Sequence, residues 1–187
     1  MLNKYISEEM GLVIKKIANE YPDVVFCGSL GLVLNDKLDR EVKDIDILVK
    51  KNYYQKGKFY NNIRIGSESD SHKFMVGKDE VLSFKLEFPI FDKKIKVDVL
   101  YNKNVKPQFE LIFFDDVRIC VEKPEAAINA KIKYIEHDIS HDSILKHLKD
   151  LIYLEVDKNV IIKSIDNSHL MVSKTKDNCD DDIDFLF

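Results

Sequence analysis

One stretch of sequence decides which fold we expect. Residues 24–49 read VVFCGSLGLVLNDKLDREVKDIDILV. The first four residues predict a short buried strand, and the pair Gly28-Ser29 predicts a tight turn that leads into a short helix. A polar loop follows, and the apolar residues that end the stretch predict a second strand, with Asp44 and Asp46 at its start.

The two aspartates are spaced for a shared role. Asp44 and Asp46 are two residues apart in a predicted strand, so their side chains lie on the same face of it. Two adjacent carboxylates repel each other, which raises the free energy of ionising both unless a cation neutralises them. Mg²⁺ binds one or two carboxylates and completes its coordination with water and phosphate oxygens. The pair is therefore a candidate metal site, and two solvated acids at the start of a strand are the alternative.

The Gly28-Ser29 turn and a later aspartate extend this candidate site. A turn between a strand and a helix leaves backbone N–H groups available to a phosphate, and the serine hydroxyl is a further donor. Asp98 lies in IKVDVLY, residues 95–101, on the polar side of a predicted strand. Each of these signals is common when it occurs alone, so the prediction depends on their combination.

The remaining pattern predicts an α+β fold with a helical C-terminal part. Alternating apolar and polar residues predict further strands, the first two as a hairpin: 81–88, 95–101 and 117–121. Apolar residues at helical spacing predict helices near both ends of the chain: 8–18, 124–139, 143–156 and 157–165. Residues 50–79 give mixed signals and receive no assignment.

We expect one domain over residues 1–171, with its sheet at about 22–121 and its helical part at about 124–167. Residues 172–187 form an acidic, loosely held tail that carries most of the net charge of -4. A second DID triplet in this tail has no Gly-Ser turn before it, and we interpret its acids as solvated charges. There is no apolar run of eighteen residues, and the three cysteines are scattered, which together predict a cytoplasmic protein without a membrane span.

Four segments together resemble the nucleotidyltransferase superfamily with the polymerase-beta-like fold: CGSLGL…LDREVKDIDILV, IKVDVLY, EKPEAAINAKI and KHLKDLIYL. The resemblance runs from about Val24 to Leu154. Within the superfamily the segments are similar to minimal transferases related to abortive-infection toxins of the AbiEii type. The resemblance implies a small mixed β-sheet flanked by helices.

The resemblance also implies a reaction and a role for each strand residue. In this superfamily an NMP is transferred from an NTP such as ATP to a hydroxyl group, with Mg²⁺ or Mn²⁺ and release of pyrophosphate. Gly28 and Ser29 would bind the triphosphate, and Asp44 and Asp46 would hold the metal. Asp98 would bind a second metal or activate the hydroxyl as a base. A small molecule, an RNA end such as that of tRNA, or a protein could be the acceptor, and an inactive nucleotide-binding or regulatory module is the alternative.

Further residues match positions near the nucleotide in relatives. Arg40 resembles an arginine of many relatives, and its alternative is a simple loop charge. Lys131 corresponds to a phosphate-contacting lysine, and its alternative is an exposed helix lysine. Lys149 and Asp150 match a pair beside the nucleotide. Relatives often carry another acid where this chain has Tyr153, which favours the inactive module.

Two histidines suggest a different function class. His137 and His141 are four residues apart on a predicted helix, a spacing that can chelate a metal and would suit a hydrolase. The catalytic glutamate of that motif is missing, and a polar turn with exposed histidines is the alternative. No dense Lys/Arg face or aromatic-basic strand motif stands out, so we predict no dedicated DNA-binding motif.

Overall fold

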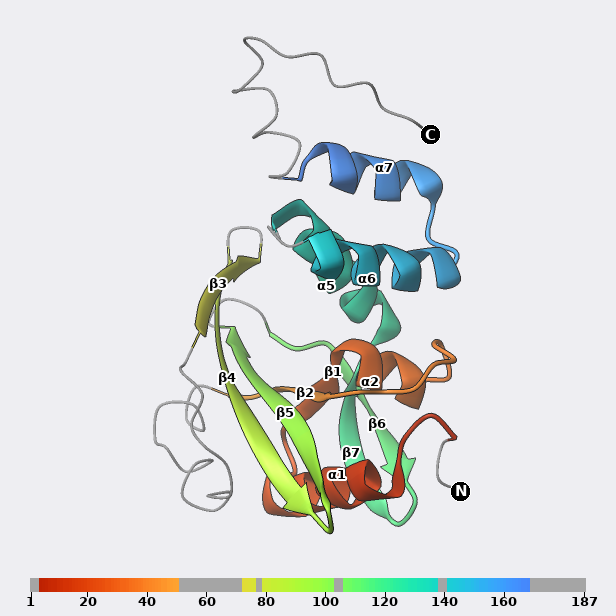
Figure 1. Ribbon diagram of the computed structural model, residues 1–187. Helices are drawn as coiled ribbons and strands as arrows, with labels where there is room; N and C mark the ends of the chain where they lie inside the picture. Colours follow the sequence, from red (N-terminus) through yellow and green to blue (C-terminus); the bar gives the residue numbers. More distant parts are fainter. Residues whose placement is uncertain (1–3, 51–71, 77–78, 103–105, 138–140, 169–187) are drawn as a thin grey trace. The chain divides into compact units, whose positions relative to one another are not determined.

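The computed structural model describes residues 4–50, 72–76, 79–102, 106–137 and 141–168 (Figure 1). The chain divides into two compact units, Met1–Asn129 and Ala130–Phe187, called unit 1 and unit 2 below. The acidic tail with the second DID triplet lies outside the described residues, and so does most of the unassigned segment 50–79.

Unit 1 is built on one mixed sheet, which agrees with the predicted α+β class. Its described strands are β1 (Val25–Cys27), β2 (Ile45–Leu48), β3 (His72–Val76), β4 (Asp79–Ile90), β5 (Lys93–Asn102), β6 (Phe109–Phe114) and β7 (Val117–Glu122). The strand order is β3-β4-β5-β2-β1-β7-β6. The β1–β7 and β2–β5 pairs are parallel, and the other neighbours are antiparallel. The short central strands β1 and β2 therefore lie between longer ones.

Alternating burial explains how the central strands are oriented. In β2 the side chains of Ile45 and Ile47 are fully buried, while the acid between them is half-buried. The same alternation in β5 buries Val97 and Val99 on either side of Asp98. One face of these strands thus belongs to the hydrophobic core, and the other face carries the polar residues.

Helix α1 (Glu8–Glu20) covers the core of unit 1. The Ser7 hydroxyl accepts the Met10 N–H at 3.2 Å and caps the helix. The helix buries an apolar stripe made of Met10, Val13, Ile14, Ile17 and Ala18. An ion pair joins Glu9 to Lys93 in β5 at 2.7 Å, and this contact lowers the pKa of Glu9 to about 2. The helix is thereby attached to the sheet by charge as well as by packing.

Two strands were not predicted. β3 falls within the unassigned segment, and β6 is an edge strand that pairs with β7. Alternate residues of β6 remain exposed: Phe109 by 45%, Leu111 by 49% and Phe113 by 75%. Because an edge strand with apolar residues on its open face lacks the usual alternation of a half-buried strand, the sequence pattern did not identify it.

Unit 2 is helical. Helix α5 (Pro124–His137) runs from the end of unit 1 into unit 2, and α6 (His141–Tyr153) and α7 (Lys158–Asp166) follow. The Asp157 carboxylate caps α7 by accepting the Asn159 N–H at 2.8 Å. The rings of Tyr134 and His147 stack with centroids 5.2 Å apart, which joins α5 to α6. The predicted helix 143–156 ends earlier, at Tyr153.

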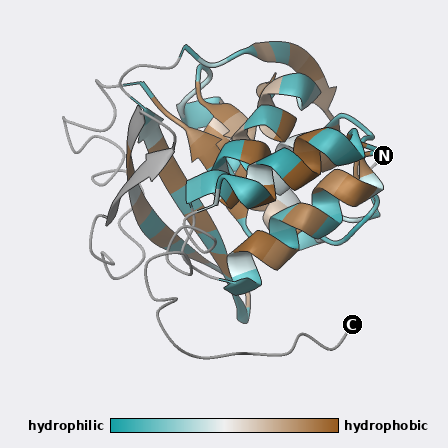
Figure 2. Cartoon of the chain, turned by 90° about the horizontal axis from the view of Figure 1, so that it is seen from above, coloured by the Kyte–Doolittle hydropathy of each residue, from teal (hydrophilic) through white to brown (hydrophobic). Residues whose placement is uncertain are grey.

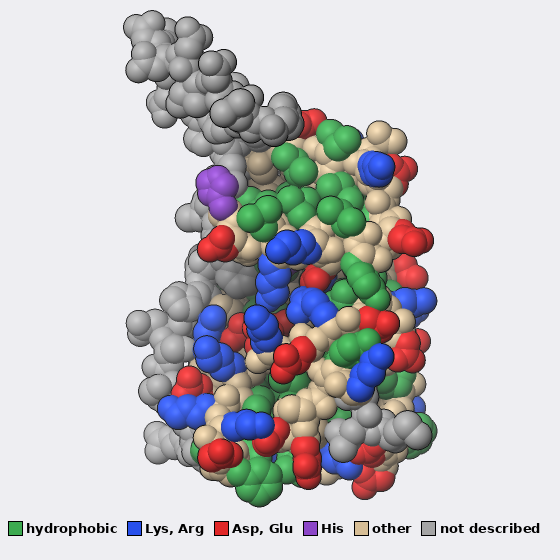
Figure 3. All heavy atoms as spheres, turned by 45° about the vertical axis from the view of Figure 1, so that its right-hand side comes forward, with side chains coloured by type: hydrophobic (Ala, Val, Ile, Leu, Met, Phe, Trp, Pro, Cys, Tyr) green, Lys and Arg blue, Asp and Glu red, His purple; other side chains and the backbone are tan. Residues whose placement is uncertain are grey.

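The outer surface of unit 2 is partly apolar. Brown and teal residues lie side by side along its helices in Figure 2, and hydrophobic side chains gather over them in Figure 3. The exposed apolar residues of α6 and α7 are Leu145, Ile152, Tyr153, Val160 and Ile162. Among the described residues, no helix has the length and apolar character needed to cross a membrane.

Candidate functional site

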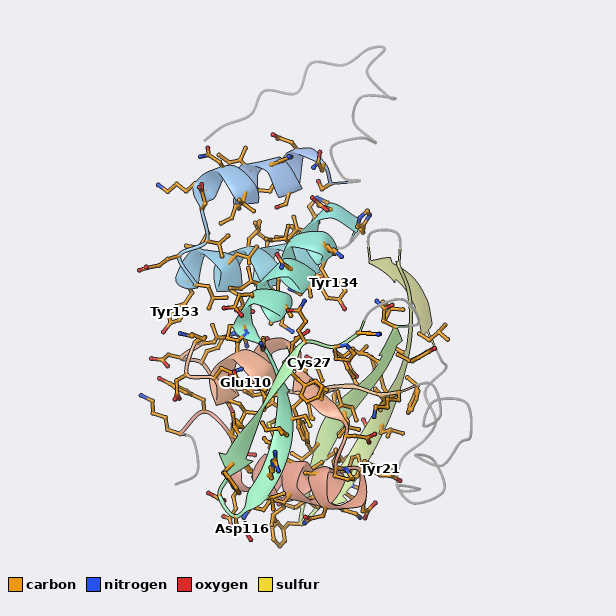
Figure 4. The ribbon with its side chains drawn as sticks, turned by 180° about the vertical axis from the view of Figure 1, so that it is seen from behind. Tyr21, Cys27, Glu110, Asp116, Tyr134 and Tyr153 are labelled. Atoms are coloured by element: carbon orange, nitrogen blue, oxygen red, sulfur yellow. The ribbon has the colours of Figure 1, made fainter. Side chains whose placement is uncertain are left out.

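The Gly28-Ser29 bend connects a strand to a helix. β1 ends at Cys27, and α2 (Gly28–Leu34) begins at the next residue, so no loop separates them. Figure 4 labels Cys27 at this junction, within the core of unit 1. Gly28 has φ of +63°, a conformation that glycine adopts without steric cost. Ser29 follows inside the helix with 5% of its surface exposed.

The bend lies against the Asp46 side chain. In the antiparallel β1–β2 pair, Cys27 is opposite Asp46, so the residue after Cys27 must pass close to that acid. A Cβ atom on Gly28 would overlap Asp46 Oδ2 and would lie 3.1 Å from its Cγ. A glycine is therefore required here for two reasons, its positive φ and the lack of space for a side chain.

Asp98 and Asp46 are neighbours in adjacent parallel strands. Their Cα atoms are register partners in the β2–β5 pair, and residues that pair in this way project from the same face of a sheet. Asp44 lies one residue before β2 and is half-buried. The three acids of the predicted site thus come from two adjacent strands at one part of the sheet.

Arg40 contacts the bend. Its guanidinium donates to the Ser29 hydroxyl oxygen at 2.7 Å, and a second, longer contact reaches the Glu41 carbonyl at 3.4 Å. Arg40 therefore has a defined partner, so it is more than a loop charge. It brings a permanent positive charge to Ser29, and a guanidinium of this kind suits a phosphate.

Two further charged residues at the site were not predicted from the sequence. Lys85 of β4 is opposite Asp98 in the β4–β5 hairpin, and its ammonium lies 3.8 Å from Asp98 Oδ2. Glu122, the last residue of β7, is 8% exposed, and its Oε2 accepts the Gly28 N–H at 3.3 Å. The alternation of the 81–88 segment places Lys85 on the polar face, which is a usable signal. No comparable signal identifies Glu122, because its contact spans 94 residues.

The donor set suits a hard divalent cation. Within the described ranges, no group of three or more His, Cys, Asp or Glu side chains is arranged to hold a metal ion. However, Mg²⁺ needs only one or two carboxylates, because water and phosphate oxygens complete its shell. Asp46 and Asp98 provide such oxygens from neighbouring strands, and because Gly28 has no side chain, the Asp46 carboxylate can pack directly against the bend. These carboxylate oxygens therefore fit a hard divalent cation.

Comparison with solved structures identifies the fold. No protein-family model and no curated protein matches the sequence. The crystal structure of an antigenic nucleotidyltransferase-like protein from Paracoccidioides brasiliensis superposes with a TM-score of 0.53 and 14% identity, over 92% of this chain and 91% of that one. The chain has a nucleotidyltransferase-like fold. The structure of JHP933 from Helicobacter pylori also matches, with a TM-score of 0.42 and 15% identity, over 91% and 95% of the two chains.

The nucleotidyltransferase-like fold confirms the fold predicted from the strand motifs. The resemblance to AbiEii-type transferases remains a prediction, and so do the roles of the individual site residues. The geometry of unit 1 nevertheless brings five predicted residues into one place by contact or by register: Gly28, Ser29, Arg40, Asp46 and Asp98.

Apart from Asp44, the other predicted residues lie in unit 2. Lys131 of α5 and Asp150 of α6 form an ion pair at 2.8 Å, with side chains that are 5% and 4% exposed. The alternative of an exposed helix lysine at position 131 is therefore wrong. Lys149, next to Asp150, is exposed. The lysine–aspartate motif of the sequence thus contains one residue in a buried pair and one on the surface.

The proposed histidine site does not have the expected geometry. His137 is the last residue of α5, and His141 is the first residue of α6. The two histidines belong to separate helices, so the spacing of one turn on a single helix is not met. The idea of a histidine site required both residues on one helix, although the predicted helices 124–139 and 143–156 already left His141 between them.

Replacing Gly28 with alanine tests the contact with Asp46. We expect Gly28→Ala to lose about 1–2 kcal/mol of unfolding free energy from the backbone conformation alone, and more from the contact with the carboxylate. Adding Asp46→Ala should recover the contact part of the loss and leave the backbone part. Urea denaturation of the wild type, of Gly28→Ala and of the double variant measures the backbone part and the contact part of the loss. A Gly28→Ala protein as stable as the wild type would contradict the described bend.

The buried Lys131–Asp150 pair gives a second stability test. Lys131→Met leaves the Asp150 carboxylate buried without its counter-charge, so we expect a loss of about 3–5 kcal/mol in unfolding free energy. The double variant Lys131→Met/Asp150→Leu should be close to the wild type. Lys149→Met, at the exposed neighbouring position, is the control and should change stability by less than about 0.5 kcal/mol. Equal stability of the two single lysine variants would argue against the pair.

Proposed function

We propose that this protein is a Mg²⁺-dependent nucleotidyltransferase that transfers an NMP from an NTP to a hydroxyl group of an acceptor and releases pyrophosphate. One observation carries the proposal: Asp46 and Asp98 are register partners on adjacent strands, and the Gly28 bend packs directly against the Asp46 carboxylate. The nucleotidyltransferase-like fold supports it. An isolated pair of acids would not support the proposal, because such pairs are common on exposed strands.

The reaction forms one phosphorus–oxygen bond and breaks another. The acceptor oxygen attacks the α-phosphorus of the NTP, the bond from that phosphorus to the bridging oxygen breaks, and pyrophosphate leaves. The hydroxyl proton passes to a base, for which Asp98 is the candidate. Such a transfer depends mainly on positioning and charge stabilisation, so the protein needs fixed polar groups rather than a covalent nucleophile.

The chain's own residues have distinct roles in this proposal. Asp44 and Asp46 would hold Mg²⁺ or Mn²⁺, and Asp98 would either bind a second ion or act as the base. A bound divalent cation neutralises phosphate charge and lowers the pKa of the attacking hydroxyl. The Ser29 hydroxyl and the Arg40 guanidinium, already joined at 2.7 Å, are the phosphate donors of unit 1. Ser29 is held in its rotamer by this contact, which lowers the entropic cost of binding.

A nucleotide-binding module without turnover is the second candidate. It is favoured by Tyr153, which stands where relatives often have an acid and which is 51% exposed at the end of α6. The ion pair of Lys85 with Asp98 also favours it, because this ammonium competes with a cation for the same carboxylate. The intact set of strand acids favours turnover.

The acceptor and the compartment are further parts of the proposal. A small molecule, an RNA end such as that of tRNA, and a protein side chain all offer the hydroxyl that the reaction needs. Cys27 and Cys120 are buried and form no disulfide among the described residues, and burial raises the pKa of the Cys120 thiol. Reduced thiols suit a cytoplasmic protein.

Label transfer from an NTP tests the function directly. The protein is incubated with each of the four NTPs labelled at the α-phosphate, Mg²⁺ or Mn²⁺, and a cell extract. We expect label on an acceptor and release of unlabelled pyrophosphate. Asp46→Asn should lower the rate about a hundredfold or more, the scale of a lost electrostatic contact to the transition state.

The matched control is Asp92→Asn, which removes an exposed carboxylate in the turn between β4 and β5. It changes the net charge by the same amount and should leave the rate unchanged. NTP binding without any label transfer would select the inactive module. Equal activity of the wild type and Asp46→Asn would exclude the proposed site.

A further inference from the structure

Glu122 is a buried acid that needs a physical explanation. It ends β7 and is 8% exposed, although burying a carboxylate is unfavourable unless hydrogen bonds or charges compensate it. In the parallel β1–β7 pair, Phe26 is the register partner of Val121. The next residue of each strand, Cys27 and Glu122, therefore stands at the point where the chain turns into α2.

The contacts of Glu122 reach both ends of α2. Its side-chain Oε2 accepts the N–H of Gly28, the first residue of the helix, at 3.3 Å. Its backbone carbonyl accepts a hydrogen bond of 2.9 Å from the side-chain amide of Asn35, which is the C-cap of the helix. The same Asn35 amide donates to the Gly31 carbonyl at 3.0 Å. One residue of β7 thus holds the start and the end of the helix that carries Ser29.

The middle of α2 also lies close to Glu122. A Cβ atom on Gly31 would lie 3.8 Å from Glu122 Cβ and 3.2 Å from the Phe26 carbonyl oxygen. A glycine at position 31 therefore lets the helix pack directly onto the ends of β1 and β7. This close packing limits how far the helix can shift relative to Glu122.

The bend needs such a restraint because glycine supplies none of its own. Gly28 has access to more backbone conformations than any other residue, and its φ of +63° is only one of them. A hydrogen bond from its N–H to a carboxylate selects this conformation, and an anion at the start of a helix is electrostatically favourable. Gly28 is thus positioned between two acids, with Asp46 beside its Cα and Glu122 at its N–H.

We propose that Glu122 is a positioning residue, which fixes the Gly28-Ser29 bend against Asp46 and so sets the place of the Ser29 donor. This inference rests on the proposed function for its consequence in catalysis. It also changes the role of Gly28. Because the Gly28 N–H is engaged by Glu122, the phosphate is bound by Ser29 and Arg40, and Gly28 provides the positive φ that turns the chain beside Asp46.

Amide hydrogen exchange at Gly28, measured by NMR on the full chain without nucleotide, tests the restraint itself. In Glu122→Ala the acceptor is lost, and we expect exchange at Gly28 to become about tenfold faster. In Glu122→Gln the side-chain oxygen remains, and exchange should stay close to the wild-type rate. Asn35→Ala should loosen the end of α2 while Gly28 remains protected. Unchanged exchange at Gly28 in Glu122→Ala would overturn the inference.

The KM for the NTP and kcat, measured with the same variants, test the consequence for the site. A displaced Ser29 weakens phosphate binding, so Glu122→Ala should raise the KM about tenfold with a smaller change in kcat, and Glu122→Gln should restore it. Glu125→Ala, an exposed acid in the first turn of α5, is the control and should behave as the wild type.

The possible failures are distinguishable. If Glu122→Gln is as impaired as Glu122→Ala, the carboxylate itself contacts substrate or cation, and the positioning role is wrong. If the wild type binds and transfers no nucleotide, the proposed function fails, while the exchange rates still decide whether Glu122 holds the bend. Thermal unfolding of each variant shows whether it is folded. If Glu122→Ala does not fold, Glu122→Gln still tests the positioning role.

Discussion

The close approach of Gly28 to the Asp46 carboxylate is the constraint on which the site depends. The antiparallel pairing of β1 with β2 puts Cys27 opposite Asp46, and the chain must then leave the sheet at once to begin α2. Only a residue with no side chain and a positive φ satisfies both demands. If this contact opened, α2 would shift, and Ser29 with its Arg40 partner would move away from the acids.

Around this contact, the charged groups are fixed before any ligand arrives. Arg40 holds the Ser29 hydroxyl, Lys85 faces Asp98, and the Gly28 N–H binds Glu122. Groups that are already oriented do not have to reorganise when charge develops in a reaction, which is the main source of electrostatic catalysis. The contact of Lys85 is the loosest of the three, because its side chain is 57% exposed and water screens the pair.

The sequence predicted the parts of the site that depend on local pattern. The alternation of residues in β2 and β5 places Asp46 and Asp98 on the polar faces of their strands, and the Gly-Ser pair after a buried strand marks the bend. The sequence did not predict the parallel pairing of β2 with β5, because no local pattern specifies which strands become neighbours. Glu122 and Lys85 went unpredicted for the same reason, since each acts on a residue of another strand or helix.

In unit 2, the two residues of the lysine–aspartate motif have different environments. The lysine–aspartate match at positions 149 and 150 suggested two residues beside a nucleotide. In the structure Asp150 is buried against Lys131 of the preceding helix, at a separation of 19 residues that periodicity cannot reveal, while Lys149 is exposed. A buried ion pair adds little net stability compared with apolar residues, but breaking it is costly, so it specifies how two helices pair. The Lys131–Asp150 pair therefore joins α5 to α6, and the nucleotide role of these two residues stays a prediction.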